Sequence, residues 1–137
     1  MKFEEFRKDV EIKASVRPGR YVVAKVANCS KLSEKMFAVI KDYNETTIVA
    51  EENHELNIIE EEKFFKIISF ETKLPFNLVG FLAYITGILA NEGISILAIS
   101  AYSTDHILIK ENDLNRALKI LKDNGVKITK SSNESLK

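Results

Sequence analysis

Cysteine and net charge are both scarce in this sequence of 137 residues. Cys29 is the only cysteine, which excludes an intrachain disulfide and a metal site built from several cysteines. We expect its thiol to be buried or to lie at a strand edge. Twenty basic residues balance twenty acidic ones, and the lack of a basic surplus argues against a nucleic-acid partner. The opening segment 1–13 contains no apolar signal core, which favours the cytoplasm.

Patterns that carry catalysis or hold cofactors are missing as well. The sequence has no glycine-rich phosphate loop, and no residue stands out as a nucleophile. His54, His106, Asp105 and the glutamates do not show the spacing of metal ligands. We expect His54, in an acidic loop, to be solvated, and His106 to be a hydrogen-bonded or edge histidine of a strand. The sequence therefore predicts no catalytic residue, no metal site, no cofactor and no enzymatic activity.

One stretch of 18 residues, from Leu74 to Asn91, carries no charge. Its length is at the lower limit for crossing about 30 Å of hydrocarbon, and Pro75, Asn77 and Gly80 interrupt it. A buried helix explains this stretch better than a membrane span, so we expect no membrane association.

The chain from residue 61 onward alternates between strand and helix patterns. Apolar residues at helical spacing predict one helix that opens near Asn77 and a second one capped by Asp113. Strands are predicted at 61–74, 94–100, 106–110 and 126–129. The strand 94–100 is apolar on both faces, so both should be covered. The order β-α-β-β-α-β predicts an α+β, ferredoxin-like antiparallel sheet with both helices on one face.

The N-terminal half resembles a weaker copy of the same unit. An alternating strand pattern covers 9–16, a turn at Pro18-Gly19 follows, and 21–27 is strand-like. The segment 30–36 allows one or two helical turns, and the short, acidic segment 53–62 stands where a second helix would belong. A hairpin is expected around Asn44-Glu45. We therefore predict a degenerate domain at 1–62, a complete domain at 63–130 and a disordered tail at 131–137.

The two predicted hairpins match at an offset of 59 positions. At this offset Tyr43 aligns with Tyr102, and three further apolar pairs coincide: Ile40 with Ile99, Ile48 with Ile107, and Val49 with Leu108. We expect both halves to present the same kind of hairpin.

Two features of the C-terminal half suit a small ligand. Backbone N–H groups at Asn77 to Gly80, where a helix opens, favour an anion such as a carboxylate. Asp105 in the second hairpin could hold an ammonium or a guanidinium, beside the aromatic ring of Tyr102. Each feature also has a purely structural explanation, in which Asn77 is an N-cap and Asp105 a turn residue.

The segment "LPFNLVGFLAYITGILANEGISILAISAYSTDHILIKENDLNRALKILKDNG" resembles the C-terminal half of the small tandem-ACT-domain proteins of bacteria. It is also similar to the ACT repeats of the cytosolic arginine sensors of animals. The family pattern is a leucine and glycine at the first helix, "GIS", a serine before an aromatic residue, "(S/T)D" before an apolar strand, and "DL..A...L". The resemblance is strong over residues 63–125.

The resemblance implies ferredoxin-like domains in tandem that bind amino acids or other small ligands, usually where two domains meet. It implies a ligand-binding set of seven residues: Asn77, Val79, Gly80, Ala101, Tyr102, Thr104 and Asp105. Some relatives carry an acid where this sequence has Asn77, so a strongly cationic ligand has one partner fewer here.

Two functions remain open at this stage. The first is a regulatory module that senses a small molecule, with an amino acid as the expected ligand. The alternative is an interaction or oligomerisation module that binds no ligand. We also expect a homodimer, because the helix after Pro75 is apolar almost all round and needs more cover than one chain provides.

Overall fold

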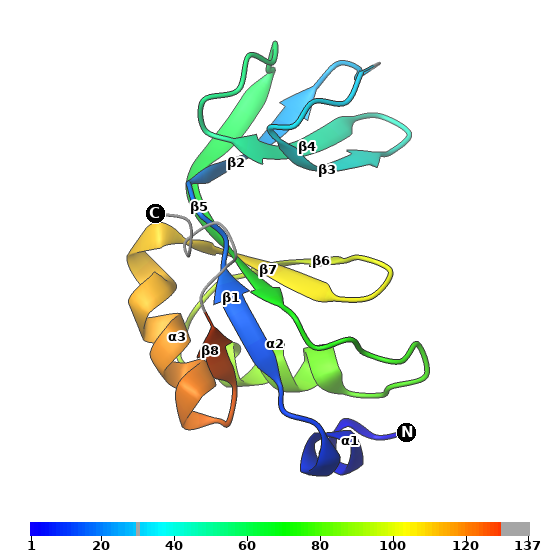
Figure 1. Ribbon diagram of the computed structural model, residues 1–137. Helices are drawn as coiled ribbons and strands as arrows, with labels where there is room; N and C mark the ends of the chain where they lie inside the picture. The colour runs from blue at the N-terminus through cyan, green and yellow to red at the C-terminus, as the bar shows by residue number, and fades with distance from the viewer. Residues whose placement is uncertain (30, 130–137) are drawn as a thin grey trace. The chain divides into compact units, whose positions relative to one another are not determined.

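The computed structural model describes residues 1–29 and 31–129, and its chain divides into two compact units (Figure 1). Unit 1 comprises residues 1–18 and the chain from Ile67 onward, and unit 2 comprises residues 19–66. The first 18 residues thus belong with the C-terminal half, which differs from the expected grouping of residues 1–62. The division into domains at 62 and 63 stays a prediction, and the tail 131–137 lies outside the described residues.

Unit 1 follows the chain order that the sequence predicted. Its elements are β5, α2, β6, β7, α3 and β8, which confirms the β-α-β-β-α-β pattern of a ferredoxin-like fold. Their bounds in that order are Glu60–Phe70, Phe81–Ala90, Leu97–Ser100, Asp105–Lys110, Leu114–Asp123 and Lys127–Thr129. Of β5, only the part from Ile67 onward belongs to unit 1. A short 3-10 turn, η1 (Glu111–Asp113), leads into α3.

A further strand, β1 (Lys13–Val16), completes the sheet of unit 1. The strand order is β6-β7-β5-β1-β8, with β1 antiparallel to β5 and parallel to β8. In a plain ferredoxin-like sheet the first and last strands of the unit are neighbours, whereas here β1 separates β5 from β8.

The core of unit 1 lies between the sheet and its helices. Ile68 and Phe70 of β5 and Ile107 and Ile109 of β7 point into it, because alternate side chains of a strand share a face. The helices add one apolar side chain per turn to the same cluster: Phe81, Ile85, Leu89, Ala117 and Leu121. Both helices therefore cover one face of the sheet, as predicted.

The uncharged stretch 74–91 forms a loop followed by α2. This helix has 10 residues. Among the helices of residues 1–29 and 31–129, none is long and apolar enough to cross a membrane.

Two elements of unit 1 differ from their expected extents. α2 begins at Phe81 rather than near Asn77, because Gly80 adopts a left-handed conformation with φ of 99° just before the helix. β6 begins only at Leu97, and that side chain is 44% exposed. The prediction that 94–100 is covered on both faces is therefore wrong. β6 is an edge strand with β7 as its one neighbour among the described strands, so it receives less cover than a central strand.

A short helix that the sequence pattern did not indicate, α1 (Phe3–Asp9), precedes β1. Phe3 is buried, and its ring centroid lies 5.3 Å from those of Phe81 and Tyr84. Arg7 donates a hydrogen bond of 2.8 Å to the carbonyl of Asn124, just beyond the end of α3. These contacts fasten α1 to both other helices.

Unit 2 consists of strands, as far as residues 19–29 and 31–66 are described. β2 (Tyr21–Val26), β3 (Met36–Lys41) and β4 (Thr46–Glu51) join the first part of β5 in the order β3-β4-β2-β5. With strands numbered within each unit, this is the order 2-3-1-4, which β6, β7, β5 and β8 also follow. The helical turns expected within 30–36 are absent from the described residues of that segment, and 53–62 forms no helix either.

The two hairpins agree in detail at the offset of 59 positions. Ile40 pairs with Thr47 as Ile99 pairs with His106, and β3 and β6 both end one residue after these pairs. The turns carry the same hydrogen bond: Asp42 N–H to the carbonyl of Glu45, and Ala101 N–H to that of Thr104, each at 2.8 Å. The prediction that both halves present the same kind of hairpin is confirmed.

Candidate functional site

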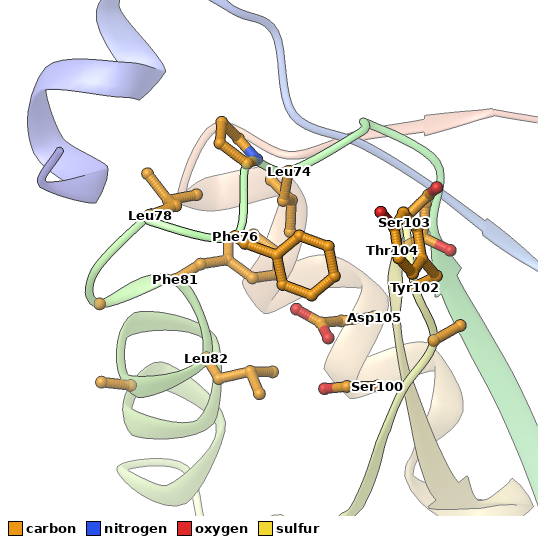
Figure 2. A pocket seen from close by; sticks show the side chains of 14 residues that line it. Leu74, Phe76, Leu78, Phe81, Leu82, Ser100, Tyr102, Ser103, Thr104 and Asp105 are labelled. Carbon is orange, nitrogen blue, oxygen red and sulfur yellow. The ribbon is translucent and has the colours of Figure 1, made fainter.

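A cavity of about 330 Å³ lies within unit 1, at the end of the sheet where α2 begins (Figure 2). One wall is the loop from Leu74 to Gly80 together with the first turn of α2. The opposite wall is the turn between β6 and β7. Fourteen residues line the cavity: Leu74, Pro75, Phe76, Leu78, Gly80, Phe81, Leu82, Ala83, Ser100, Ala101, Tyr102, Ser103, Thr104 and Asp105. Its volume is at the lower end of the range of small-molecule sites, about 300–1,000 Å³.

Backbone hydrogen bonds hold the two walls in place. Leu74 N–H donates to the carbonyl of Ser103 at 3.2 Å, which ties the loop to the hairpin turn. The bond from Ala101 N–H to the carbonyl of Thr104 closes that turn. Ser100 and Asp105 are paired at the ends of β6 and β7. The cavity is thus framed by main-chain contacts and does not depend on flexible side chains alone.

The first turn of α2 brings partial positive charge to one side of the cavity. The N–H groups that open an α-helix have no carbonyl acceptor within it. Gly80 is the N-cap and supplies no side chain, and Gly80 and the next three residues line the cavity. An anionic group of a ligand can therefore approach these N–H groups.

Asp105 faces this helix start from the hairpin. Figure 2 shows its carboxylate pointing into the cavity from the first residue of β7. The fourteen lining residues include one carboxylate and no Lys, Arg or His. A cation bound in the cavity would therefore find Asp105 as its charged partner.

Five of the seven predicted ligand residues line the cavity: Gly80, Ala101, Tyr102, Thr104 and Asp105. The cavity lining does not include Asn77 and Val79. Their backbone is engaged by the N-terminal segment instead. Val79 N–H donates to the carbonyl of Met1 at 2.8 Å, and the N-terminal ammonium donates to the carbonyl of Asn77 at 3.2 Å. The helix-start N–H groups that face the cavity thus belong to the residues after Gly80, and the ligand role of all seven residues stays a prediction.

Phe76 lines the cavity but was not among the predicted residues. Its ring meets that of Tyr102 edge to face, with centroids 4.8 Å apart and an angle of 76° between the planes. A single aromatic residue in a loop has no periodicity that marks it as functional. Its place directly after Pro75 and before the predicted anion-binding segment is the signal that could have drawn attention to it.

His106 lies behind the cavity, on the strand that Asp105 opens. Its Nδ1 forms a hydrogen bond of 2.8 Å with the hydroxyl of Ser69, and its Nε2 lies 3.5 Å from that of Thr104. Burial lowers the pKa of His106, the positive charge of Arg17 lowers it further, and the carboxylate of Asp105 raises it in opposition. The histidine is hydrogen-bonded within the sheet, as its strand position predicted.

Unit 2 has a separate groove of about 500 Å³, lined by residues 31–36 and 54–56. The prediction that His54 is solvated is wrong, because its side chain is only 10% exposed. The chain turns back on itself there: Leu56 N–H donates to Nδ1 of His54 at 3.0 Å, and Nε2 lies 3.9 Å from a carboxylate oxygen of Glu61. Cys29 is partly buried against the apolar cluster of this unit, and its thiol donates to the carbonyl of Lys31 at 3.5 Å.

Within residues 1–29 and 31–129, no three His, Cys, Asp or Glu side chains lie together in a way that could hold a metal ion. What the cavity offers is a carboxylate, hydroxyl groups, aromatic rings and a helix start, which suit binding.

Comparison with protein families gives a match over residues 60–123 to the family described as the ACT domain. No curated protein sequence matches the chain. Among solved structures, a protein of Agobacterium tumefaciens is similar with a TM-score of 0.76 and 19% identity, over 89% of this chain and 95% of that one. A Vibrio cholerae protein of unknown function, described as a possible transport protein, gives 0.68 and 24%, over 82% of this chain and 89% of that one.

An aspartate kinase of Clostridium acetobutylicum, described as an allosteric enzyme, is also similar. The TM-score is 0.62 at 10% identity, over 82% of this chain and 34% of the kinase. At these identities the likeness to the three structures shows a shared fold.

Proposed function

We propose that the chain, whose residues 60–123 match the ACT domain family, is a regulatory module that binds a small molecule without catalysing a reaction. We further propose an amino acid as the ligand and the cavity of unit 1 as its site. The observation that carries this proposal is the pairing of the α2 start with Asp105 across one cavity. A helix start favours a carboxylate and Asp105 favours an ammonium, so the two ends of an amino acid would each meet an opposite charge.

The size of the cavity agrees with such a ligand. A water molecule occupies about 30 Å³ in the liquid, so 330 Å³ corresponds to a molecule of about ten non-hydrogen atoms. Most free amino acids fall near this size. The fold shared with an aspartate kinase described as an allosteric enzyme also supports a regulatory role.

A thermal-shift screen of the twenty amino acids, each at 10 mM and followed by calorimetry on every hit, tests the proposal. A ligand at a hundred times its Kd stabilises the folded protein by about 2.7 kcal/mol, and Asp105→Asn should remove this gain. Asp9→Asn, which removes the same charge from the exposed end of α1, is the matched control and should keep it. If none of the twenty amino acids shifts the thermal unfolding midpoint or gives a measurable heat of binding, the proposal is overturned.

A module that binds no ligand and only joins protein surfaces is the second candidate. It is favoured by Leu97, which is exposed on the edge strand β6 and could contact another chain. The two candidates differ in their response to Asp105→Ala. If this variant keeps every assembly property and no ligand is found for the parent protein, the interaction module is the better account.

We also propose that the chain forms a homodimer. Leu82 and Ile88 of α2 pack only in part against the core, so a second copy could bury what one chain leaves exposed. Size-exclusion chromatography with light scattering at tens of micromolar decides the matter, and a monomer at that concentration refutes it. A cytoplasmic location and the lack of nucleic-acid and membrane partners stay predictions from the sequence.

A further inference from the structure

Two large aromatic side chains stand at the cavity of unit 1 with almost no cover from the rest of the protein. Phe76 is 78% exposed and Tyr102 is 83% exposed. Their rings nevertheless contact each other, at the centroid distance of 4.8 Å given above. Figure 2 shows them coming from opposite walls, Phe76 from the loop after Pro75 and Tyr102 from the hairpin turn. They meet over the gap between the walls of the cavity.

Backbone hydrogen bonds tie the two walls together beneath this contact. The bond between Leu74 and Ser103 sets the separation of the two walls. The bond within the turn from Ala101 to Thr104 holds the residue that carries the second ring. Because both rings are exposed, rotation of their side chains is enough to open a space between them.

The chemistry of the lining indicates that the rings of Phe76 and Tyr102 would hold a cationic group of a ligand. The faces of aromatic rings carry partial negative charge and attract a cation within about 6 Å of the ring centroid. An edge-to-face pair leaves at least one ring face open. Asp105 is the sole carboxylate in the same lining, which contains no Lys, Arg or His.

We infer that Phe76 and Tyr102 are specificity-determining residues that clamp the ammonium group of the ligand against Asp105. This inference rests on the proposed function, because it assigns a binding partner within the same cavity. The clamp selects for the positive charge of the ligand, whereas the remaining lining selects for its size.

Unit 2 offers a turn tyrosine in a different setting. At the position equivalent to Tyr102, Tyr43 is fully exposed, at 101%. The position equivalent to Asp105 is held by Thr46, whose side chain is buried and uncharged. The turn of unit 2 carries Asp42 and Glu45 beside Tyr43 but no carboxylate at the position equivalent to Asp105, so Tyr43 provides an internal control.

The test uses pairs of probes that differ only in the charged group. Each amino acid is compared with its 2-hydroxy acid: alanine with lactate, leucine with 2-hydroxy-4-methylpentanoate, and phenylalanine with phenyllactate. For the pair whose side chain the cavity accommodates, calorimetry on the full chain should give an affinity at least tenfold higher for the amino acid than for its 2-hydroxy acid. Phe76→Leu and Tyr102→Leu keep an apolar side chain but remove the ring. Each variant should lower the affinity for the amino acid by about 3- to 30-fold and should change the affinity for the hydroxy acid by less than about twofold.

The controls separate recognition from folding. Tyr43→Leu should change neither affinity, and the midpoints of thermal unfolding of the Leu variants should match the parent because both rings are exposed. If the ring variants weaken binding of both probes equally, the clamp is overturned and the proposed function stands. If the hydroxy acid binds as tightly as the amino acid, the clamp and the pairing of the ammonium with Asp105 are both overturned. If none of the twenty amino acids binds, the proposed function fails and the clamp with it.

Discussion

The start of α2 yields the sharpest prediction about stability, because two glycines of this region differ in backbone conformation. Gly80 precedes the helix with φ of 99°, a conformation that side chains other than glycine rarely adopt. Gly87 lies within the same helix and has ordinary helical geometry. The same substitution, glycine to alanine, should therefore have opposite effects at the two positions.

The magnitudes follow from the surroundings of the added methyl group. At Gly80 its nearest neighbour would be Cβ of Phe3 at 3.9 Å, an ordinary contact, so the cost is that of the backbone alone. This cost is about 1–2 kcal/mol. At Gly87 no atom would lie within 4 Å, and alanine should stabilise the helix by about 1 kcal/mol. The two variants should thus differ by about 2–3 kcal/mol in free energy of unfolding.

Urea unfolding followed by circular dichroism at 222 nm measures this difference directly. All three helices of the described chain belong to unit 1, so the helical signal reports on the unit in which both glycines lie. With a slope of about 2 kcal/mol per molar urea, the midpoints should differ by about 1 M or more. Gly80→Ala with the stability of the parent would show that the left-handed conformation is not required there. Gly87→Ala below the parent would show that the helix has no room for the methyl group.

Three further predictions concern single side chains. The pKa of His106 is lowered from 6.5 in the folded state, so the stability that its neutral form contributes is complete above pH 6.5 and declines as the pH falls below that value. Between pH 7 and pH 5 the parent should therefore lose more stability in urea unfolding than His106→Gln, and equal losses would contradict the lowered pKa. Arg7→Ala removes the hydrogen bond to Asn124 and the contacts of the guanidinium with the rings of Phe3 at 5.1 Å and Tyr84 at 4.7 Å. Urea unfolding should show a loss of about 1–3 kcal/mol in the free energy of unfolding, whereas Lys119→Ala, in an exposed ion pair, should lose under about 0.5 kcal/mol. Ile85→Ala at a fully buried position should cost about 2–5 kcal/mol by the same assay, and a loss no greater than that of the half-buried Leu82→Ala would contradict the packing described here.

The C-terminal fold was predictable because each of its elements carries its own periodic pattern. Helical spacing marked α2 and α3, and alternation marked β7, so the order of elements followed from local sequence alone. α1 escaped notice because its seven residues bear mainly charge, and only Phe3 of this helix is buried. The insertion of β1 between β5 and β8 was also missed, because alternation identifies a strand but not its neighbours.

The candidate site was predictable in part for similar reasons. Asp105 and Tyr102 belong to a turn whose position follows from the strands on either side of it. The helix start was expected too early, because Leu78 continues the helical spacing of α2 into a loop that Gly80 then separates from the helix. The occupation of the Val79 backbone by Met1 depends on a contact between distant parts of the chain, and no local pattern records it.

The insertion of β1 has a consequence for the way the protein is made. The segment 19–66 leaves the ribosome as one uninterrupted piece and can form its strands at once. β1 is synthesised before it, yet its two neighbours are β5 and β8, and β8 contains the last described residues of the chain. At about 5–20 residues per second, β1 waits several seconds for its final partner. Unit 1 therefore closes only after β8 has been synthesised, and until then the free edge of β1 is open to pairing with other chains.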